Sequence, residues 1–335
     1  MMKTPIQVFL TFDVEGPMQK EDCFSKDSIR TLLRVLKLLK NHQLKGIFFI
    51  LGTIIEDLVS SGEILDKLGE HTIGYHSSSH SIRPRIFEYT DVMSYEKAVK
   101  ISIKRETSNI NPENGAIKGT GGLQRLREIF PHHKIECFRA PFLCWSPPHL
   151  EALSKLGILF DFSTNINEEP IQFHNMTFYP FPIAVDGIIQ KIASAVDGSR
   201  RIFPRLLISR LLSRKRTVLL IHPTKIAFKE TPYNRKIING STGLPFQLTK
   251  NSVLEIEVNF LALDIFLRML KFLEQAKLIE VTSRIQRSRM DLDRRAISAE
   301  NLYFRNAKIC KKLFDYSPQY MYNHFQKFLE NSTST

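Results

Sequence analysis

Hydrophobic and polar positions follow a repeating order along this chain, in which short apolar runs alternate with longer amphipathic stretches. Apolar runs of strand length occur at 6–12 (IQVFLTF), 46–51 (GIFFIL) and 217–221 (TVLLI). Leucines and charged residues recur at helical spacing in segments such as 28–42 (SIRTLLRVLKLLKNH) and 253–276. Strands that alternate with helices are typical of βα units, so the pattern predicts an α/β fold with a mostly parallel sheet.

Further strands, and a change of pattern near the C-terminus, complete this picture. Other runs of strand length lie at 71–76, 134–140, 157–162, 177–185 and 278–283. Residues 284–335 are polar and basic, with helical patterns such as AENLYFRNAKICKKLF and no further strand. We therefore expect a sheet-forming domain over residues 1–283, followed by a basic helical extension over 284–335.

The composition is typical of a soluble globular chain, since 43% of the 335 residues are hydrophobic and 24% are charged. The longest apolar run, GIFFILGTII at 46–55, is shorter than the roughly 18 to 20 residues of a membrane span, so no transmembrane segment is expected. The start, MMKTPIQVFLTFDVEG, lacks the features of a secretory signal. Four cysteines without a C-x-x-C pair indicate reduced thiols in a cytoplasmic protein: Cys23, Cys137, Cys144 and Cys310.

The charge is strongly positive, with 47 basic and 34 acidic residues and a formal net charge of +13. This balance favours an anionic partner such as a membrane surface, a nucleic acid or an anionic glycan. The segment 199–217 (SRRIFPRLLISRLLSRKRT) has seven basic residues, no acidic residue and apolar residues at roughly helical spacing. Such a helix can lie on an anionic membrane or bind nucleic acid, or it can simply pack on the fold with a solvated basic face.

Two carboxylates follow the first expected strand. In TFDVEG at 11–16, Asp13 and Glu15 are two residues apart, so in an extended segment both face one side while Val14 faces the other. The carboxyl ends of parallel strands form the rim where α/β folds place their chemistry. One carboxylate could bind a cation there while the other takes a proton from water. An acidic strand end that caps the next helix is the structural alternative.

Histidine and arginine side chains follow other strands at the same rim. His76 and His80, in TIGYHSSSH at 72–80, are four residues apart, so they can converge on one metal ion or lie side by side on an exposed turn. Arg139 in FRAPF can pin a carboxylate with two hydrogen bonds or form a surface salt bridge. His222 ends the run TVLLIHP, which suits a general acid or a core histidine. The order and shared placement of these motifs favour the functional interpretation.

The motifs TFDVEG, HSSSH, FRAPF and LLIHP, in this order, resemble those of the polysaccharide deacetylases, the NodB-homology family of metal-dependent carbohydrate esterases. HTIGYHSSSH is similar to the family's glycine-histidine-x-x-x-histidine segment. ALSKLGILFDFS at 152–163 resembles the segment between the arginine motif and the last histidine. The resemblance covers about residues 1–283 and leaves the extension without a counterpart.

The resemblance implies a distorted (β/α) barrel of about seven parallel strands, with Zn²⁺ or a related divalent ion bound by His76, His80 and a carboxylate. The serines between these histidines are small enough to let both imidazoles reach one ion. The resemblance also implies that Asp13 is the catalytic base and that Arg139 orients it. It further implies an oxyanion donor at the backbone N–H near Phe142, and His222 as the general acid.

The chain departs from the family pattern at two places. Family members commonly have two adjacent aspartates, the second of which binds the metal, but Val14 occupies that position here. The resemblance therefore assigns the metal-ligand role to Glu15, as in members with an acid-x-acid motif. No Asp-Trp motif follows FRAPF, and Asp161 is the candidate partner of His222. These departures leave open that the site is weakened or repurposed.

The sequence therefore favours a metal-dependent amide hydrolase that removes an acetyl group from an N-acetylated sugar or polysaccharide. Hydrolysis of another non-peptide C–N bond is the nearest enzymatic alternative. A non-catalytic basic barrel that binds a membrane surface or nucleic acid is the alternative from another class. A tightly bound divalent ion would support the two enzymatic hypotheses and contradict the non-catalytic one.

Overall fold

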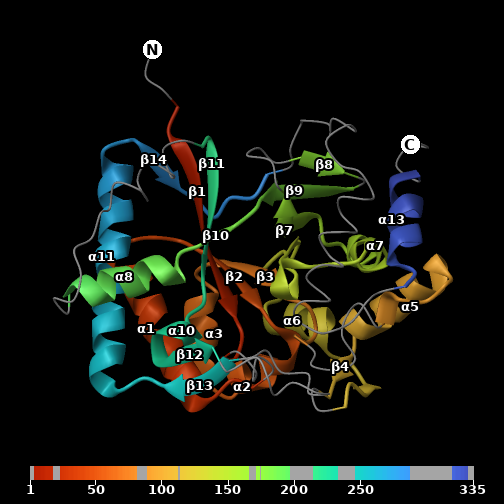
Figure 1. Cartoon of the computed structure of the whole chain (residues 1–335), viewed down its shortest axis with the longest axis horizontal. Helices are drawn as coiled ribbons and strands as arrows, with labels where there is room; N and C mark the ends of the chain where they lie inside the picture. Colours follow the sequence, from red (N-terminus) through yellow and green to blue (C-terminus); the bar gives the residue numbers. More distant parts are fainter. Residues whose placement is uncertain are drawn as a thin grey trace.

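A curved, mostly parallel sheet surrounded by helices forms the body of the molecule (Figure 1). The computed structural model describes residues 4–17, 23–80, 89–111, 114–165, 171–173, 175–196, 214–232, 246–286 and 319–330. Within these ranges the apolar runs form the strands and the amphipathic stretches form helices, so the prediction of an α/β fold is confirmed.

Ten strands of the described residues pair into one sheet, in the order β10-β11-β1-β2-β3-β6-β7-β9-β8, with β14 beside β1. Their bounds are β1 (Ile6–Val14), β2 (Ile47–Ile50), β3 (Thr72–Tyr75), β6 (Cys137–Phe138), β7 (Phe160–Asn165), β8 (Ile171–Phe173), β9 (Met176–Pro180), β10 (Ile183–Ala184), β11 (Arg216–Ile221) and β14 (Ile279–Val281). The pairings are parallel except that of β8 with β9. A barrel-like sheet is therefore confirmed, with more strands than the expected seven.

Strand β1 lies in the interior of the sheet, because it pairs along both of its edges. It pairs with β11 from Gln7 to Phe12, with β14 from Ile6 to Val8, and with β2 from Thr11 to Val14. Its residues from Val8 to Gly16 are buried. Because the neighbouring strands run parallel, the segments that follow β1, β3, β6 and β11 meet at one rim of the sheet.

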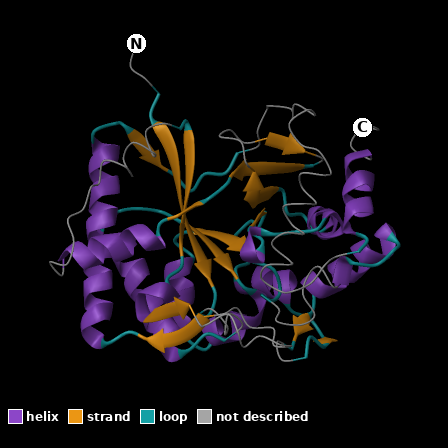
Figure 2. Cartoon of the chain, in the orientation of Figure 1, coloured by secondary structure: helices purple, strands orange, loops and turns teal. Residues whose placement is uncertain are grey.

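Helices lie to the left of, below and to the right of the central strands in Figure 2. Their bounds are α1 (Lys26–Asn41), α2 (Ile55–Val59), α3 (Gly62–Leu68), α5 (Tyr95–Glu106), α6 (Gly122–Ile129), α7 (Pro147–Lys155), α8 (Asp186–Val196), α10 (Thr224–Ala227), α11 (Val253–Gln275) and α13 (Met321–Glu330), with 3₁₀ turns η1 (Gly52–Ile54) and η2 (Pro141–Leu143). Helix α11 packs against α8, and α5 packs against α7. No helix in the described part of the chain is long and apolar enough to cross a membrane.

Local sequence explains where the two longest helices begin. Ser25 accepts a hydrogen bond from the Ser28 backbone N–H and caps α1, whose buried face includes Leu32, Val35 and Leu36. Ser252 and Glu255 form a reciprocal capping box at the start of α11. Each helix therefore starts at a hydroxyl residue and buries one apolar stripe against the sheet.

Several short elements differ from the sequence expectations. Two short helices, α2 and α3, follow β2, and two hairpins were not expected: β4 (Asn109–Ile110) with β5 (Ile117–Lys118), and β12 (Phe228–Pro232) with β13 (Phe246–Lys250). These strands are two to five residues long, too short to show a clear apolar alternation.

The C-terminal extension contributes helix α13, which packs against α7. Met321 and Phe325 of α13 are 1% and 0% exposed, and the Phe325 ring lies 5.8 Å from that of Trp145. The domain boundary at 283/284 stays a prediction. Most of the basic segment 199–217 lies outside the described residues; its last two residues, Arg216 and Thr217, begin β11.

Candidate active site

The carboxylate, histidine and arginine motifs meet at the carboxyl ends of the central strands. A cavity of about 270 Å³ opens there and is lined by Asp13, Glu15, His76, His80 and His222, among others. Four different segments of the chain supply these groups, because β1, β3, β6 and β11 end at the same rim. Val14, between the two carboxylates, is 1% exposed and packs in the core, as the alternation along an extended strand predicts.

Glu15, His76 and His80 converge on one point. Oε2 of Glu15 lies 2.9 Å from Nε2 of His76 and 2.8 Å from Nε2 of His80. All three side chains are at most 10% exposed. Burial alone would raise the pKa of Glu15, but the two imidazoles hold it well below its ordinary value. Within the described residues this is the group of histidine and acidic side chains that could hold a metal ion.

The hydrogen bonding of His76 fits a cation at this point. Nδ1 of His76 lies 2.8 Å from the carbonyl oxygen of Arg139, which can only accept, so Nδ1 carries the proton. In the neutral ring, Nε2 then presents a lone pair to the Glu15 oxygen. Two lone pairs facing each other require a proton or a cation between them. Two imidazole nitrogens and one carboxylate oxygen form a donor set that suits Zn²⁺.

Asp13 has a different partner. Nη1 of Arg139 donates to Oδ1 of Asp13 at 2.7 Å, and Nη2 donates to Oγ1 of Thr11 at 2.8 Å. The guanidinium is fully buried and lies 4.4 Å from the centre of the Phe49 ring. The Thr11 hydroxyl in turn donates to the carbonyl of Leu219 at 2.6 Å. Arg139 therefore binds Asp13 while β1 and β11 hold the arginine in place.

His222 faces the same cavity from β11, and its partner is Asp186. The His222 Nδ1 lies 2.6 Å from Oδ2 of Asp186, and the His222 backbone N–H donates to Oδ1 at 2.9 Å. Nε2 of His222 lies 3.9 Å from Oδ2 of Asp13 and 3.7 Å from Oε1 of Glu15. Burial alone would lower the pKa of His222, but the Asp186 carboxylate raises it above its ordinary value.

The prediction that Asp161 partners His222 is therefore wrong. Asp161 accepts hydrogen bonds from the Ser163 backbone N–H at 3.0 Å and from its hydroxyl at 2.7 Å. Ser163 in turn accepts from the Ala140 backbone N–H at 2.8 Å. Asp161 thus supports the strand end that carries Arg139 and does not contact the cavity. Asp186, at the start of α8, was missed because only the pairing of β10 with β11 brings it to His222.

Phe142 lies beside the histidines at the cavity wall. Its ring centre is 4.4 Å from that of His80, and both Phe142 and Leu143 line the cavity. The two residues have positive φ angles of 54° and 57°, which are costly for residues with a Cβ. The sharp turn after Pro141 therefore places Phe142 beside His80 at the edge of the cavity.

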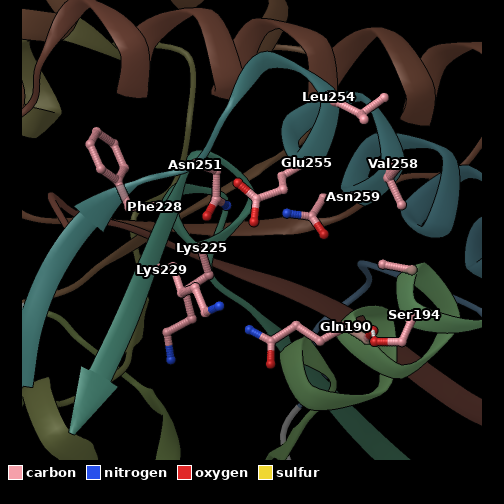
Figure 3. A pocket seen from close by; sticks show the side chains of 11 residues that line it. Gln190, Ser194, Lys225, Phe228, Lys229, Asn251, Leu254, Glu255, Val258 and Asn259 are labelled. Atoms are coloured by element: carbon pink, nitrogen blue, oxygen red, sulfur yellow. Dashed lines mark hydrogen bonds between the residues drawn. The ribbon is translucent and has the colours of Figure 1, made fainter. Parts of the chain in front are cut away.

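A second cavity, of about 360 Å³, adjoins the first and shares Lys225 with it. Figure 3 shows Lys225, Lys229 and Gln190 on one side of this cavity, and Asn251, Glu255 and Asn259 near the start of α11 on the other. Asn251 and Asn259 both donate to the carbonyl oxygen of Ile226, at 2.9 and 3.0 Å, so their amide orientation is fixed. The Lys225 ammonium lies 3.5 Å from Oδ2 of Asp186.

Several solved structures are similar to this chain. A CE4 esterase from Streptococcus mutans is 16% identical, with 84% of this chain and 86% of that chain covered and a TM-score of 0.41. The catalytic domain of a peptidoglycan N-acetylglucosamine deacetylase from Eubacterium rectale is 15% identical, with 86% and 97% covered and a TM-score of 0.37.

A CE4 family pseudoenzyme from Bacillus anthracis is also similar, at 16% identity and a TM-score of 0.39. The match covers 81% of this chain but 62% of the pseudoenzyme, so this chain spans less than two thirds of that protein's length. No curated protein matches the sequence.

The N-terminal part of the chain also matches a known protein family. Residues 3–160 match the family described as polysaccharide deacetylase. The matched range contains the two carboxylates at the end of β1, the two histidines that face Glu15, and Arg139, whereas Asp186 and His222 lie beyond it. This chain is therefore similar to the polysaccharide deacetylase family over residues 3–160.

Proposed function

We propose that the protein is a metal-dependent amide hydrolase that removes an acetyl group from an N-acetylated sugar. The observation that carries this proposal is the separation of the two carboxylates: Glu15 faces two imidazoles, and Asp13 faces Arg139. A ligand carboxylate and a base carboxylate are the two parts that such a hydrolase needs. The polysaccharide deacetylase family supports a hydrolase of this kind.

Glu15, His76 and His80 would hold the divalent ion, for which we propose Zn²⁺ because of the nitrogen-rich donor set. When bound, such an ion supplies Lewis-acid polarisation of the substrate carbonyl and of a water molecule. His76 is oriented for this task by the hydrogen bond from its Nδ1 to the Arg139 carbonyl. Arg139 would thus serve both motifs, through its backbone and through its guanidinium.

Asp13 would accept the proton of the attacking water. Arg139 binds its Oδ1, so Oδ2 is the oxygen directed toward the cavity and His222. His222 would donate a proton to the leaving sugar amine from Nε2, while Asp186 holds Nδ1. The backbone N–H of Phe142 would stabilise the oxyanion at the cavity wall.

The second cavity favours a substrate made of several linked sugar units. Its amides and lysines are groups that can bind sugar hydroxyls. Because Lys225 lines both cavities, a sugar unit next to the reacting unit can reach this second space. The preferred substrate would then be an oligomer of N-acetylated sugar rather than the free monosaccharide.

The test compares acetate release from the monosaccharide, from N-acetylglucosamine oligomers and from an activated acetyl ester. The proposal predicts turnover of the oligomers with a lower KM than the monosaccharide. His222→Ala should slow the amide reaction by about 10²- to 10⁴-fold and the ester reaction much less, because an activated alcohol leaves without a proton. Equal losses of rate on the amide and the ester would contradict the role of His222 as general acid. If the protein released no acetate from any of these substrates, the proposed deacetylase activity would be contradicted.

A further inference from the structure

A second buried polar cluster lies directly behind the loop that joins His76 to His80. Arg105 and Glu106, the last two residues of α5, are 1% and 0% exposed. Burying two charged side chains is costly unless every charge has partners. The partners define what we call the Glu106 network, which consists of Tyr75, Ser77, Ser78, Ser79, Arg105, Glu106 and His149.

Both oxygens of Glu106 are engaged by groups around this loop. Oε2 accepts from the Tyr75 hydroxyl at 2.6 Å and from the Ser78 backbone N–H at 2.9 Å. Oε1 accepts from Nε2 of His149 at 3.1 Å and from Nη1 of Arg105. Burial alone would raise the pKa of Glu106, but Arg105 and His149 hold it well below its ordinary value. Glu106 is therefore an ionised carboxylate at the centre of a set of donors.

The three serines between the metal-ligand histidines all join this network. The Ser77 hydroxyl donates to Oε1 of Glu106 at 3.0 Å and accepts from Nη1 of Arg105 at 2.6 Å. The Ser78 hydroxyl donates to the Arg105 carbonyl at 2.8 Å, and the Ser79 carbonyl accepts from Nη2 of Arg105 at 2.8 Å. The serines thus do more than leave room for two imidazoles: each one ties the loop to the end of α5.

Packing and backbone conformation show how closely the loop is held. Ser77 has a φ of 70°, an unfavourable value for a residue with a Cβ that the surrounding contacts must maintain. A Cβ at Gly52 would lie 2.7 Å from Cα of Ser78, and one at Gly122 would lie 2.1 Å from its Oγ. Neither glycine has room for a side chain, so the loop is packed on both sides.

We propose that Glu106 is a positioning residue for the metal ligands, which fixes the loop 77–79 so that His76 and His80 face Glu15 before any ion arrives. This inference rests on the proposed metal site. A pre-positioned site binds its ion without the cost of ordering the ligand loop, and outer partners of metal ligands typically change affinity by ~10- to 100-fold. Glu106 touches no ligand atom itself and acts through the serines.

The test is Glu106→Gln, which keeps the size of the side chain and replaces one acceptor oxygen with an NH₂ donor. Zn²⁺ affinity of the metal-free protein is measured by calorimetry, alongside thermal unfolding. We expect ~10- to 100-fold weaker Zn²⁺ binding, with turnover recovered at saturating Zn²⁺. Tyr75→Phe, which removes one donor to Glu106 without changing shape, should weaken binding in the same direction by a smaller factor, and it provides the test if Glu106→Gln does not fold.

Asp264→Asn is the matched control, because Asp264 of α11 forms a largely buried pair with His42, the residue that follows α1, away from the loop. It should lower stability without changing Zn²⁺ affinity. Unchanged affinity in both Glu106→Gln and Tyr75→Phe, with only a lower melting temperature, would show a merely structural network and overturn the proposal. A wild-type protein that binds no divalent ion would overturn the metal site itself, and the inference with it.

Discussion

Asp13 and Glu15 are the same kind of residue two positions apart, yet the fold gives them different partners. Arg139 binds Asp13 at 2.7 Å, whereas His76 and His80 bind Glu15 at 2.9 and 2.8 Å. Side chains two residues apart in an extended segment lie on the same face, so Asp13 and Glu15 share one face, as expected from the sequence. Their partners differ because β3 brings the two histidines to Glu15, whereas β6 brings Arg139 to Asp13.

These partners predict different results for two substitutions. Asp13→Asn should keep the metal and reduce turnover by about 10²- to 10⁴-fold, because an amide fills the space but cannot accept a proton. Glu15→Ala should lose metal first, because it removes a ligand. Metal content and deacetylation rate are measured on both variants. If Asp13 controlled metal content and Glu15 only the rate, the two roles would have to be exchanged.

His71, which is 8% exposed, makes stability depend on pH. Its Nδ1 accepts from the Gly46 backbone N–H at 3.2 Å, and burial lowers its pKa to about 4. In the unfolded chain a histidine binds a proton near its ordinary pKa, so stability is full above that value and falls as the pH drops toward the folded pKa.

We expect the free energy of unfolding to fall by about 1.5 kcal/mol between pH 6.5 and pH 5 because of this residue. His71→Asn keeps an acceptor near Nδ1 but cannot be protonated, so that part of the pH dependence should disappear. Denaturant unfolding of both proteins at the two pH values measures the difference. The same slope in wild type and variant would show that His71 is not the group responsible.

At the scale of elements, the C-terminal helix α13 is part of the packed structure. Phe325 is 0% exposed and lies against Trp145. Nε2 of His324 lies 2.7 Å from the carbonyl oxygen of Val92. The Tyr320 backbone N–H donates to Asp91 at 2.6 Å. Helix α13 thus connects the segment before α5 with the segment that follows Phe142.

Phe325→Ala should therefore weaken the docking of α13, at a cost of about 3 to 5 kcal/mol if the site does not collapse. Thermal unfolding and hydrogen exchange along α13 measure the effect. Phe272→Ala is the control, because Phe272 on α11 is 68% exposed and should change stability by only about 0.5 kcal/mol. Equal effects of the two substitutions would contradict the packing described for α13.

At the scale of the whole molecule, the sequence was most informative where apolar runs are long. The strands β1, β2 and β11 are continuous apolar segments with buried neighbours, so their positions followed from pattern alone. The short strand β8 and the β12–β13 hairpin lack such a pattern and depend on their partners. Asp186 lies 36 residues before His222, and no local signal connects them.

Local motifs therefore located the proposed metal ligands and the proposed base, and only tertiary structure located the partners that orient them. The Glu106 network is the strongest case, since it joins residues from two distant segments, α5 and α7, to the histidine motif. The location in the cytoplasm and the partner of the basic segment 199–217 stay predictions. The central claim is the metal site, because base, acid and network are all arranged around it.

Elemental analysis of the purified protein, and of its His76→Ala and His80→Ala variants, tests that claim most directly. The account predicts one tightly bound divalent ion per chain in the wild type and a sharp loss in both variants. The fold should survive, because the site lies at the rim of the sheet and not in the core. Unchanged metal content in both variants, or no divalent ion in the wild type, would contradict it.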